Sequence, residues 1–163
     1  AVSNVTISTT QNLITRQRQN VGATRVAGFE VEAETTFRRL YLSTGYLFAD
    51  SRVVEFAADP TLVGLRVPQV ARHQLTFQGR YSMEKWTLAL QGRAAGEQFD
   101  DDQNLFRLEP FLQIDLIASR RIGKNASVFA ALENVTNTRY STGRTPIRTI
   151  GSSINFRIGV RWK

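Results

Sequence analysis

Cysteine is absent from this chain, which excludes disulfides, thiolate chemistry and cysteine-based metal sites. Histidine occurs once, at His73, so a Ser-His-Asp triad or a histidine general base would have to be built on that residue. No Gly-x-Ser-x-Gly elbow accompanies it. We therefore expect His73 to be a polar residue at the start of a strand, facing a lumen or an interface, and we expect neither enzymatic activity nor a cofactor.

Long apolar runs are also missing. No stretch approaches the roughly 18 to 20 consecutive apolar residues of a transmembrane helix, and the mean hydropathy is −0.24. A membrane β-barrel stays possible, because only every second residue of a barrel wall meets lipid. No apolar run precedes a small-residue cleavage site at the N-terminus, so no signal peptide is visible and we expect a mature or truncated product.

The formal charge of the chain is +7, with a pI near 10.5. The 21 basic residues are scattered along the chain, as at Arg38 and Arg39 or at Arg157 and Arg161. A nucleic-acid module would gather them on one patch with stacking aromatic residues. We therefore expect no nucleic-acid partner.

Strict alternation of apolar and polar residues ends the chain. The even positions are Ile154, Phe156, Ile158, Val160 and Trp162, and the odd positions are Ser153, Asn155, Arg157, Gly159, Arg161 and Lys163. A period of two places one face of a strand in an apolar medium and the other in a polar one. We expect the even set to point outward, into lipid.

The same alternation recurs upstream. It covers residues 29–37, 40–48, 75–81, 86–93, 112–116 and 128–132, with a weaker first strand around Val2 to Ser8. Together these segments predict about eight strands of roughly ten residues, the span of a tilted transmembrane strand. Because the segments follow one another directly, we expect sequential neighbours to pair antiparallel, as a meander.

The connections alternate in length. Three are predicted to be tight, namely Arg38-Arg39, Ser82 to Lys85 and Arg121 to Asn125, and four to be long, namely Thr9 to Asn20, Asp50 to Gln69, Glu97 to Pro110 and Asn137 to Ser152. Short periplasmic turns and long extracellular loops are typical of outer-membrane barrels. The chain is therefore predicted to be all-β, a segment of an antiparallel transmembrane barrel whose C-terminus lies on the periplasmic side.

Charged residues occupy the strand positions opposite the apolar set. They are Glu30, Glu32, Glu34, Arg80, Arg93, Asp115, Arg157 and Arg161. The dry core of a soluble β-sandwich would rarely accept them, whereas a water-filled or plugged lumen does. The three glutamates either pair with lumenal arginines or form a hydrated ladder.

Aromatic residues stand where the predicted strands begin or end, as expected for girdles at the two membrane interfaces. This set contains Phe37, Tyr41, Phe48, Tyr81, Trp86, Phe111 and Trp162.

An acidic run, Glu97 to Asn104, falls on a predicted extracellular loop. Its oxygen atoms could bind a hard cation such as calcium, but the ligand spacing of an EF-hand is not present, and a solvated loop tip is the commoner explanation. The candidate ligand-facing residues of the loops are Phe99, Asp100, Asp101, Asp102, Arg144 and Arg148.

Several segments resemble TonB-dependent receptors. Residues 20–32 and 45–51 resemble a descending strand and the strand end after it, and Val67 to Leu75 is similar to the "P-x-x-P-R-H" motif, with Ala71 in place of the second proline. Leu132 to Tyr140 resembles the "E-N-L-F-N-x-x-Y" signature, and Gly151 to Lys163 the closing strand. The family usually ends on an aromatic residue that helps the assembly machinery recognise the barrel, whereas here Trp162 is penultimate and Lys163 is last, so either a final residue is missing or recognition tolerates the lysine.

The resemblance implies that residues 1–163 are the C-terminal portion of the receptor barrel, an incomplete part with about eight of roughly twenty-two strands and with the plug domain absent. The implied function is energy-coupled uptake of a scarce nutrient, such as a ferric siderophore or cobalamin. The implied partners are outer-membrane lipid and lipopolysaccharide, the plug and upstream strands, TonB through the absent N-terminal part, and a small-molecule ligand.

The alternative is an autonomous eight-stranded outer-membrane barrel with a structural or adhesion role. Closure would require the first strand, around Val2 to Ser8, to pair with the last, and its apolar positions Val2, Val5 and Ile7 break the period of two. We therefore expect a curved open sheet.

Overall fold

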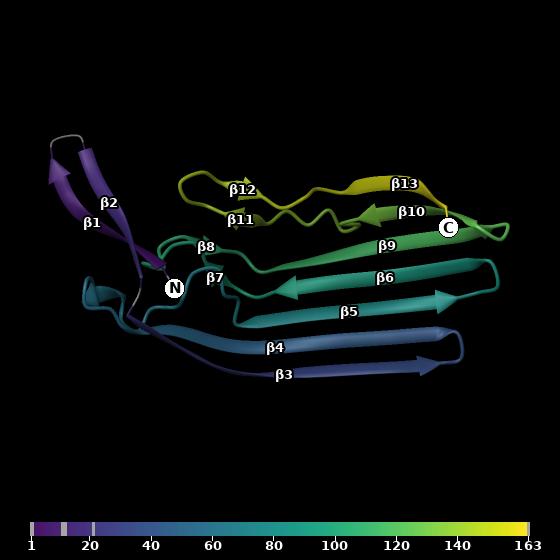
Figure 1. Ribbon diagram of the computed structural model, residues 1–163, viewed down its shortest axis with the longest axis horizontal. Helices are drawn as coiled ribbons and strands as arrows, with labels where there is room; N and C mark the ends of the chain where they lie inside the picture. The colour runs from purple at the N-terminus through teal and green to yellow at the C-terminus, as the bar shows by residue number, and fades with distance from the viewer. Residues whose placement is uncertain (1, 11–12, 21, 163) are drawn as a thin grey trace.

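One large antiparallel sheet dominates the computed structural model (Figure 1). The structure describes residues 2–10, 13–20 and 22–162, and side chains for Asn20 and residues 22–162. The sheet contains β3 (Ala23–Phe37), β4 (Leu40–Glu55), β5 (His73–Ser82), β6 (Trp86–Ala95), β9 (Phe111–Ile122), β10 (Ala126–Glu133) and β13 (Asn155–Trp162). Their order is β13-β10-β9-β6-β5-β4-β3, so the predicted meander of sequential antiparallel neighbours is confirmed.

The smaller elements lie in the long connections. They are η1 (Pro60–Leu62), β7 (Gln98–Phe99), β8 (Arg107–Leu108), β11 (Ser141–Gly143) and β12 (Thr149–Ile150), and the strands form the short hairpins β7-β8 and β11-β12. No helix in the described part of the chain is long and apolar enough to cross a membrane.

Connections of the two lengths separate to opposite ends of the sheet. Figure 1 shows the tight turns after β3, β5 and β9 at the end where the C-terminus lies, and the long loops at the other end. The left-handed conformations of Arg38 (φ 54°) and Gly123 (φ 68°) allow two of the turns to reverse the chain sharply. We call the two ends of the sheet the tight-turn end and the loop end.

The pairing register keeps apolar side chains on one face of all seven strands. This apolar face includes Phe29, Leu42, Leu75, Leu90, Leu116 and Phe156, and the opposite, polar face includes Glu32, Ser43, Thr76, Gln91, Asp115 and Arg157. On β6, Leu88 and Leu90 are exposed, whereas Thr87, Ala89 and Gln91 are half-buried. Apolar side chains that are more accessible than polar ones are the reverse of a water-soluble sheet and suit a wall in contact with lipid.

The final strand has the predicted alternation. Ile158 is 75% exposed on the apolar face, and Phe156, Val160 and Trp162 are exposed beside it. Arg157 and Arg161 lie on the polar face, in register with Ala131 and Ser127 of β10. The side chains of this strand therefore alternate between the two faces as predicted, while Lys163 lies outside the described residues.

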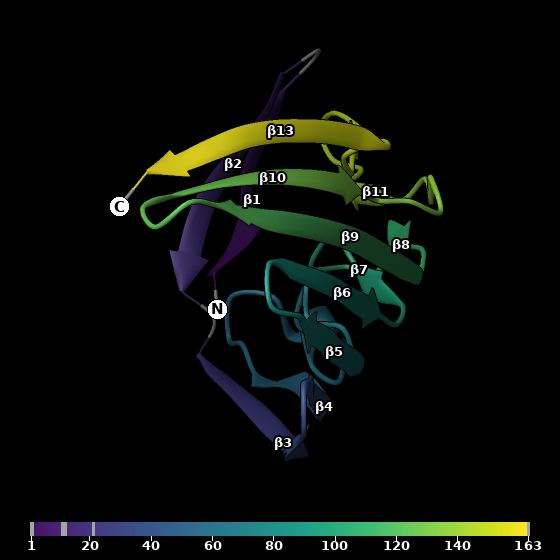
Figure 2. The ribbon, with the colours of Figure 1, turned by 90° about the vertical axis from the view of Figure 1, so that its right-hand side faces the viewer.

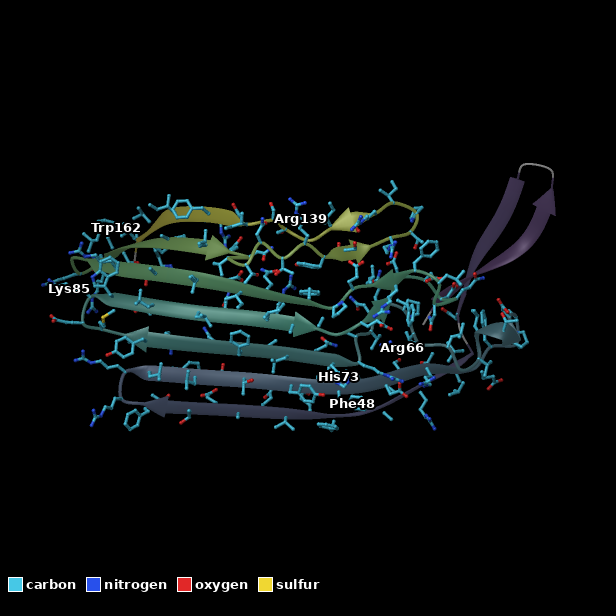
Figure 3. All side chains as sticks on the ribbon, turned by 180° about the vertical axis from the view of Figure 1, so that it is seen from behind. Phe48, Arg66, His73, Lys85, Arg139 and Trp162 are labelled. Carbon is cyan, nitrogen blue, oxygen red and sulfur yellow. The ribbon has the colours of Figure 1, made fainter. Side chains whose placement is uncertain are left out.

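Aromatic side chains form two bands on the apolar face. The band toward the loop end contains Phe29, Tyr46 and Phe48, and the Phe29 ring centroid lies 5.9 Å from that of Tyr46 and 5.7 Å from that of Phe48. The band at the tight-turn end contains Phe37, Tyr81, Trp86 and Trp162. Figure 3 shows Trp162 at one end and Phe48 farther along the strands.

Two residues predicted for these bands, Tyr41 and Phe111, instead lie on the polar face. The hydroxyl of Tyr41 donates a 3.0 Å hydrogen bond to Glu34, and the ring of Phe111 stacks on Tyr140. The face of a strand residue depends on its odd or even position, whatever its chemical type, so an aromatic residue at a strand end does not by itself indicate a lipid contact.

Residues Thr9 to Asn20 do not form the predicted loop. Most of this segment is β2 (Leu13–Asn20), which pairs antiparallel with β1 (Val2–Thr10) in a separate hairpin. The segment lacks the apolar-polar alternation of the other strands, so periodicity gives no signal for it.

The predicted loop that begins at Asp50 in fact starts later. Strand β4 continues to Glu55, and the loop folds back along its last residues through the bonds Val53 N to Leu65 O (3.0 Å) and Val67 N to Ser51 O (3.1 Å). A small core of Val53, Phe56 and Leu62 stabilises this extension. The sequence did not predict this extension, because the alternation ends before it and polar residues such as Ser51 and Arg52 follow.

The sheet is open. Figure 2, a view roughly along the strands, shows it as an arc with β3 and β13 at the two ends. Within the described part of the chain, β3 pairs only with β4 and β13 only with β10, while β1 pairs with β2 and not with β13. The expected curved, unclosed sheet is thus confirmed. Each free edge exposes unpaired backbone groups that a further strand would satisfy.

Candidate functional site

Three long loops meet at the loop end, and Arg66 joins the first two. Its guanidinium donates a 2.9 Å hydrogen bond to the carbonyl oxygen of Glu97, lies 3.6 Å from the Glu97 carboxylate, and lies over the Phe99 ring at 5.4 Å. Its backbone also makes two 2.9 Å hydrogen bonds with the side-chain amide of Asn104. Residues 56–72 and 96–110 are therefore held as one unit.

Asp100 connects this unit to the third loop. One carboxylate oxygen accepts from the backbone N–H groups of Arg144 and Thr145, both at 2.7 Å, and from the Thr145 hydroxyl at 2.8 Å. The other accepts from the Gln69 amide at 3.0 Å. Burial by itself would raise the pKa of Asp100, but the donors from Arg144, Gln69 and Thr145 outweigh it and hold the pKa below its usual value.

We expect the third loop to separate from the other two in acid. A carboxylate whose pKa is lowered by folding stabilises the structure above its unfolded pKa of 3.8, and this contribution is lost as the pH falls through the lower, folded value. Amide hydrogen exchange of residues 141–150 should therefore accelerate below pH 3.8 relative to exchange in the core of β6. Asp100→Asn should already show fast exchange at neutral pH and lose most of this pH dependence. An unchanged acid response in that variant would contradict the assignment to Asp100.

The other predicted ligand-facing residues make contacts within their own loops or between the second and third loops. Asp101 accepts from the backbone N–H groups of Leu105 (3.1 Å) and Phe106 (2.7 Å), which closes the loop tip. Arg148 donates to the Ser141 hydroxyl at 3.1 Å, and Arg144 to the carbonyl oxygen of Arg107 at 3.1 Å. Asp102 belongs to the same tip as Asp101.

The acidic run does not assemble a cation site of the kind considered from the sequence. No group of three or more His, Asp or Glu side chains in the described ranges could hold a metal ion. The carboxylates of Asp100 and Asp101 bind backbone and side-chain donors, so their role in the structure is to hold loops in place.

Apolar residues at the loop tips were not found from the sequence. Leu105 is 70% and Ile147 75% exposed, and Phe106 and Ile150 are exposed near them in the chain. The cations Arg107, Arg139 and Arg148 belong to the same loops. Isolated apolar residues within polar loops have no periodicity, so no sequence pattern distinguishes them from ordinary loop residues.

Below the loops, the polar face contains a network around Tyr140. Arg93 donates to the Tyr140 hydroxyl at 2.9 Å and to Gln113 at 3.1 Å, and Tyr140 donates to Gln113 at 3.0 Å. The Tyr140 ring is buried and stacks on Phe111, with centroids 3.9 Å apart. It also covers Gly151, where an added Cβ would lie 2.2 Å from the ring. The third loop is thereby attached to β6 and β9.

Asn134 holds the base of the same loop. Its side chain is fully buried and donates to the carbonyl oxygens of Thr138 (3.0 Å) and Ser152 (2.8 Å), while its amide oxygen accepts from the Thr138 N–H at 3.0 Å. Its own backbone N–H donates to Asp115 at 2.8 Å. Asn134 and Tyr140 of the signature segment, residues 132–140, are therefore structural ties of the third loop.

The three glutamates of β3 share the polar face, as their spacing predicts. Glu34 accepts from Tyr41, and the Arg80 guanidinium lies 4.9 Å from the centroid of that ring. The ion pairs among the described residues do not include these glutamates; Arg157, one of the expected partners, pairs with Glu133 instead.

His73 lies on the apolar face, in the aromatic band toward the loop end. It pairs with Phe48 in the register, and its Nδ1 lies 2.7 Å from the Tyr46 hydroxyl. Figure 3 shows His73 beside Phe48. The sequence predicted that His73 faces either a lumen or a membrane interface, and its place in the aromatic band agrees with the interface.

These features define the wall of a membrane β-barrel: an antiparallel meander with an accessible apolar face, aromatic bands, tight turns at one end and long loops at the other. Residues 1–135 match the family profile "TonB dependent receptor-like, beta-barrel". The chain belongs to this family.

Solved structures of receptors have the same fold. The siderophore receptor PiuA from Acinetobacter baumannii superposes with a TM-score of 0.80 at 18% identity, over 99% of this chain and 24% of the receptor. The ferric yersiniabactin uptake receptor FyuA from Yersinia pestis gives 0.79 at 18% identity, over 90% and 24%. The copper transporter OprC gives 0.75 at 14% identity, over 99% and 26%.

The chain thus spans about a quarter of the length of these solved proteins. No curated protein sequence matches it.

Proposed function

We propose that this chain is the C-terminal part of the barrel of an outer-membrane receptor that imports a scarce nutrient with energy delivered through TonB. The observation that supports it best is the joining of three long loops into one unit above a polar, charged face. A membrane barrel that only spans the bilayer does not need ordered loops, whereas a receptor needs them to position its ligand.

The proposed ligand is an anionic metal chelate of the siderophore class. The loop tips present exposed apolar side chains, including Leu105, Phe106 and Ile147, in loops that also contain Arg107, Arg139 and Arg148. Apolar surface and guanidinium groups together suit an aromatic or carboxylate-rich chelate. We also propose that the candidate ligand-facing loop residues contact this chelate and that the charges on the polar face line the lumen.

The further partners follow from a receptor of this class. Residues 1–163 would form one part of a larger barrel, with upstream strands at the edges of β3 and β13 and a plug inside. The apolar face would meet outer-membrane lipid and lipopolysaccharide, and TonB would act through the N-terminal part of the receptor.

The test is ligand uptake by cells that express the complete receptor gene. A strain lacking the gene should lose uptake of radiolabelled iron supplied as ferric catecholate or ferric citrate, and a strain lacking TonB should lose it equally. Uptake of labelled cobalamin instead would overturn the chelate assignment. Uptake that persists without TonB would contradict the proposed function itself.

A paired substitution tests the role of the loop tip. Leu105→Ser with Phe106→Ser should weaken binding of the ferric complex at least tenfold, because burial of each such side chain contributes about 1.5 kcal/mol or more. Ile122→Ser, a similar change at the tight-turn end, should leave binding unchanged. Equal binding by both variants would show that the loop tip does not contact the ligand.

A further inference from the structure

A single arginine interrupts the apolar face. Between the aromatic band of Phe29 and Phe48 and the tight turns, Arg120 is the one Lys, Arg, Asp or Glu that the described register places on this face. It lies on β9, two residues before the strand ends at Ile122. A charge at the edge of a lipid-facing surface is stable where its side chain reaches the headgroup region.

The surroundings of Arg120 suit an interface position. It pairs across the sheet with Trp86 of β6 and Val128 of β10, and its guanidinium lies 5.2 Å from the Trp86 ring centroid. Both side chains are exposed. The ion pairs of the described residues do not include Arg120, so its charge is available to an external anion.

A second cation, Lys85, lies near Arg120, because the tight turn that contains Lys85 packs against β9. The backbone N–H of Arg121 donates to the carbonyl oxygen of Lys85 at 2.8 Å, and its guanidinium donates to the carbonyl oxygen of Glu84 at 2.5 Å. A hollow of about 440 Å³ is lined there by Glu84, Lys85, Arg120, Arg121, Ile122 and Gly123. Figure 3 shows Lys85 at the tight-turn end, where Trp162 also lies.

The charge of this end is strongly positive. The tight turns and the strand residues next to them contain Arg38, Arg39, Lys85, Arg120, Arg121, Lys124 and Arg161 against a single acidic residue, Glu84. Each basic residue near a membrane surface attracts anionic lipid. A net positive hollow beside an interfacial tryptophan therefore matches a negatively charged headgroup better than a zwitterionic one.

We propose that Arg120 and Lys85 bind the phosphate of an anionic phospholipid in the leaflet at the tight-turn end. The guanidinium, already oriented by the Trp86 ring, contacts the phosphate, and the tryptophan lies at the level of the lipid ester groups. Leu88 and Leu116, farther along the apolar face, then face the acyl chains. This inference depends on the membrane-spanning arrangement in the proposed function but not on the identity of the imported ligand.

The test uses the complete receptor in nanodiscs that contain equal amounts of phosphatidylglycerol and phosphatidylethanolamine. Native mass spectrometry should show phosphatidylglycerol retained preferentially. Arg120→Gln should reduce that retention about fivefold, the factor that corresponds to one basic residue near a membrane surface. Arg161→Gln removes the same charge at the same end but on the polar face, and should leave retention unchanged.

Three results would overturn the lipid site: equal retention of the two lipids by the unaltered receptor, no loss in Arg120→Gln, or an equal loss in Arg161→Gln. Heat-modifiable gel mobility of each variant checks that the barrel is folded. A receptor that retains phosphatidylglycerol through Arg120 but fails to take up iron would leave the lipid site intact and contradict only the proposed function.

Discussion

Replacing Ile158 with arginine is expected to lower the free energy of unfolding of the receptor by about 2 to 4 kcal/mol, the cost of an arginine on the lipid face near the bilayer midplane. Ile158 lies in the middle of β13 and is 75% exposed on the apolar face. In water such an exposed position would tolerate arginine with little change. The size of the loss therefore tests whether this face meets lipid.

The matched control is Asn155→Arg, in the same strand but on the polar face, where the Glu133 carboxylate lies beside it. We expect this variant to stay within about 0.5 kcal/mol of the unaltered receptor. The measurement is urea unfolding of the receptor folded in lipid vesicles. Equal losses from the two substitutions would contradict the assignment of the faces.

Replacing Asn134 with alanine is expected to cost about 3 kcal/mol and to release the third loop from the sheet. The change leaves the Thr138 N–H and the carbonyl oxygens of Thr138 and Ser152 without their partners in a buried place. Amide exchange of residues 136–153 should rise, while exchange in β5 and β6 stays low.

Asn125 provides the control for this change, because it is an exposed asparagine in the turn between β9 and β10. Asn125→Ala should leave both unfolding and exchange unchanged. If Asn134→Ala also left unfolding and amide exchange unchanged, the signature segment would not hold the loop in place. The order of the loops would then need another explanation.

The strands and their facing were predictable because both depend on local rules. In β13, the period of two alone identifies Ile158 as outward and Arg157 as inward, since neighbouring side chains of any strand point to opposite faces. The tight turn at Gly123 was likewise visible between two alternating segments. The extension of β4 to Glu55 was not, because Ser51 and Val53 are buried there by the loop that folds back along the strand, and local alternation does not encode that contact.

The candidate site was predictable only as a set of loops. The sequence identified the acidic run with Asp100 and the third loop with Arg144, but not that the Asp100 carboxylate accepts from the Arg144 N–H 44 residues away. Similarly, Tyr140 was visible as part of a motif, but its stacking on Phe111 was not. Contacts between loops depend on the paths of two backbones at once, and no pattern within either segment encodes them.

By itself the sequence determined the class of fold, the direction of each alternating side chain and the two unlike ends of the sheet, because one residue in two had to face lipid. Only the tertiary structure decided which side chains hold the loops together, that the first two strands pair with each other, and that Arg120 lies beside Trp86 and near Lys85. The physical reason is that facing follows from local backbone geometry, whereas these contacts depend on strand register and on the meeting of distant turns.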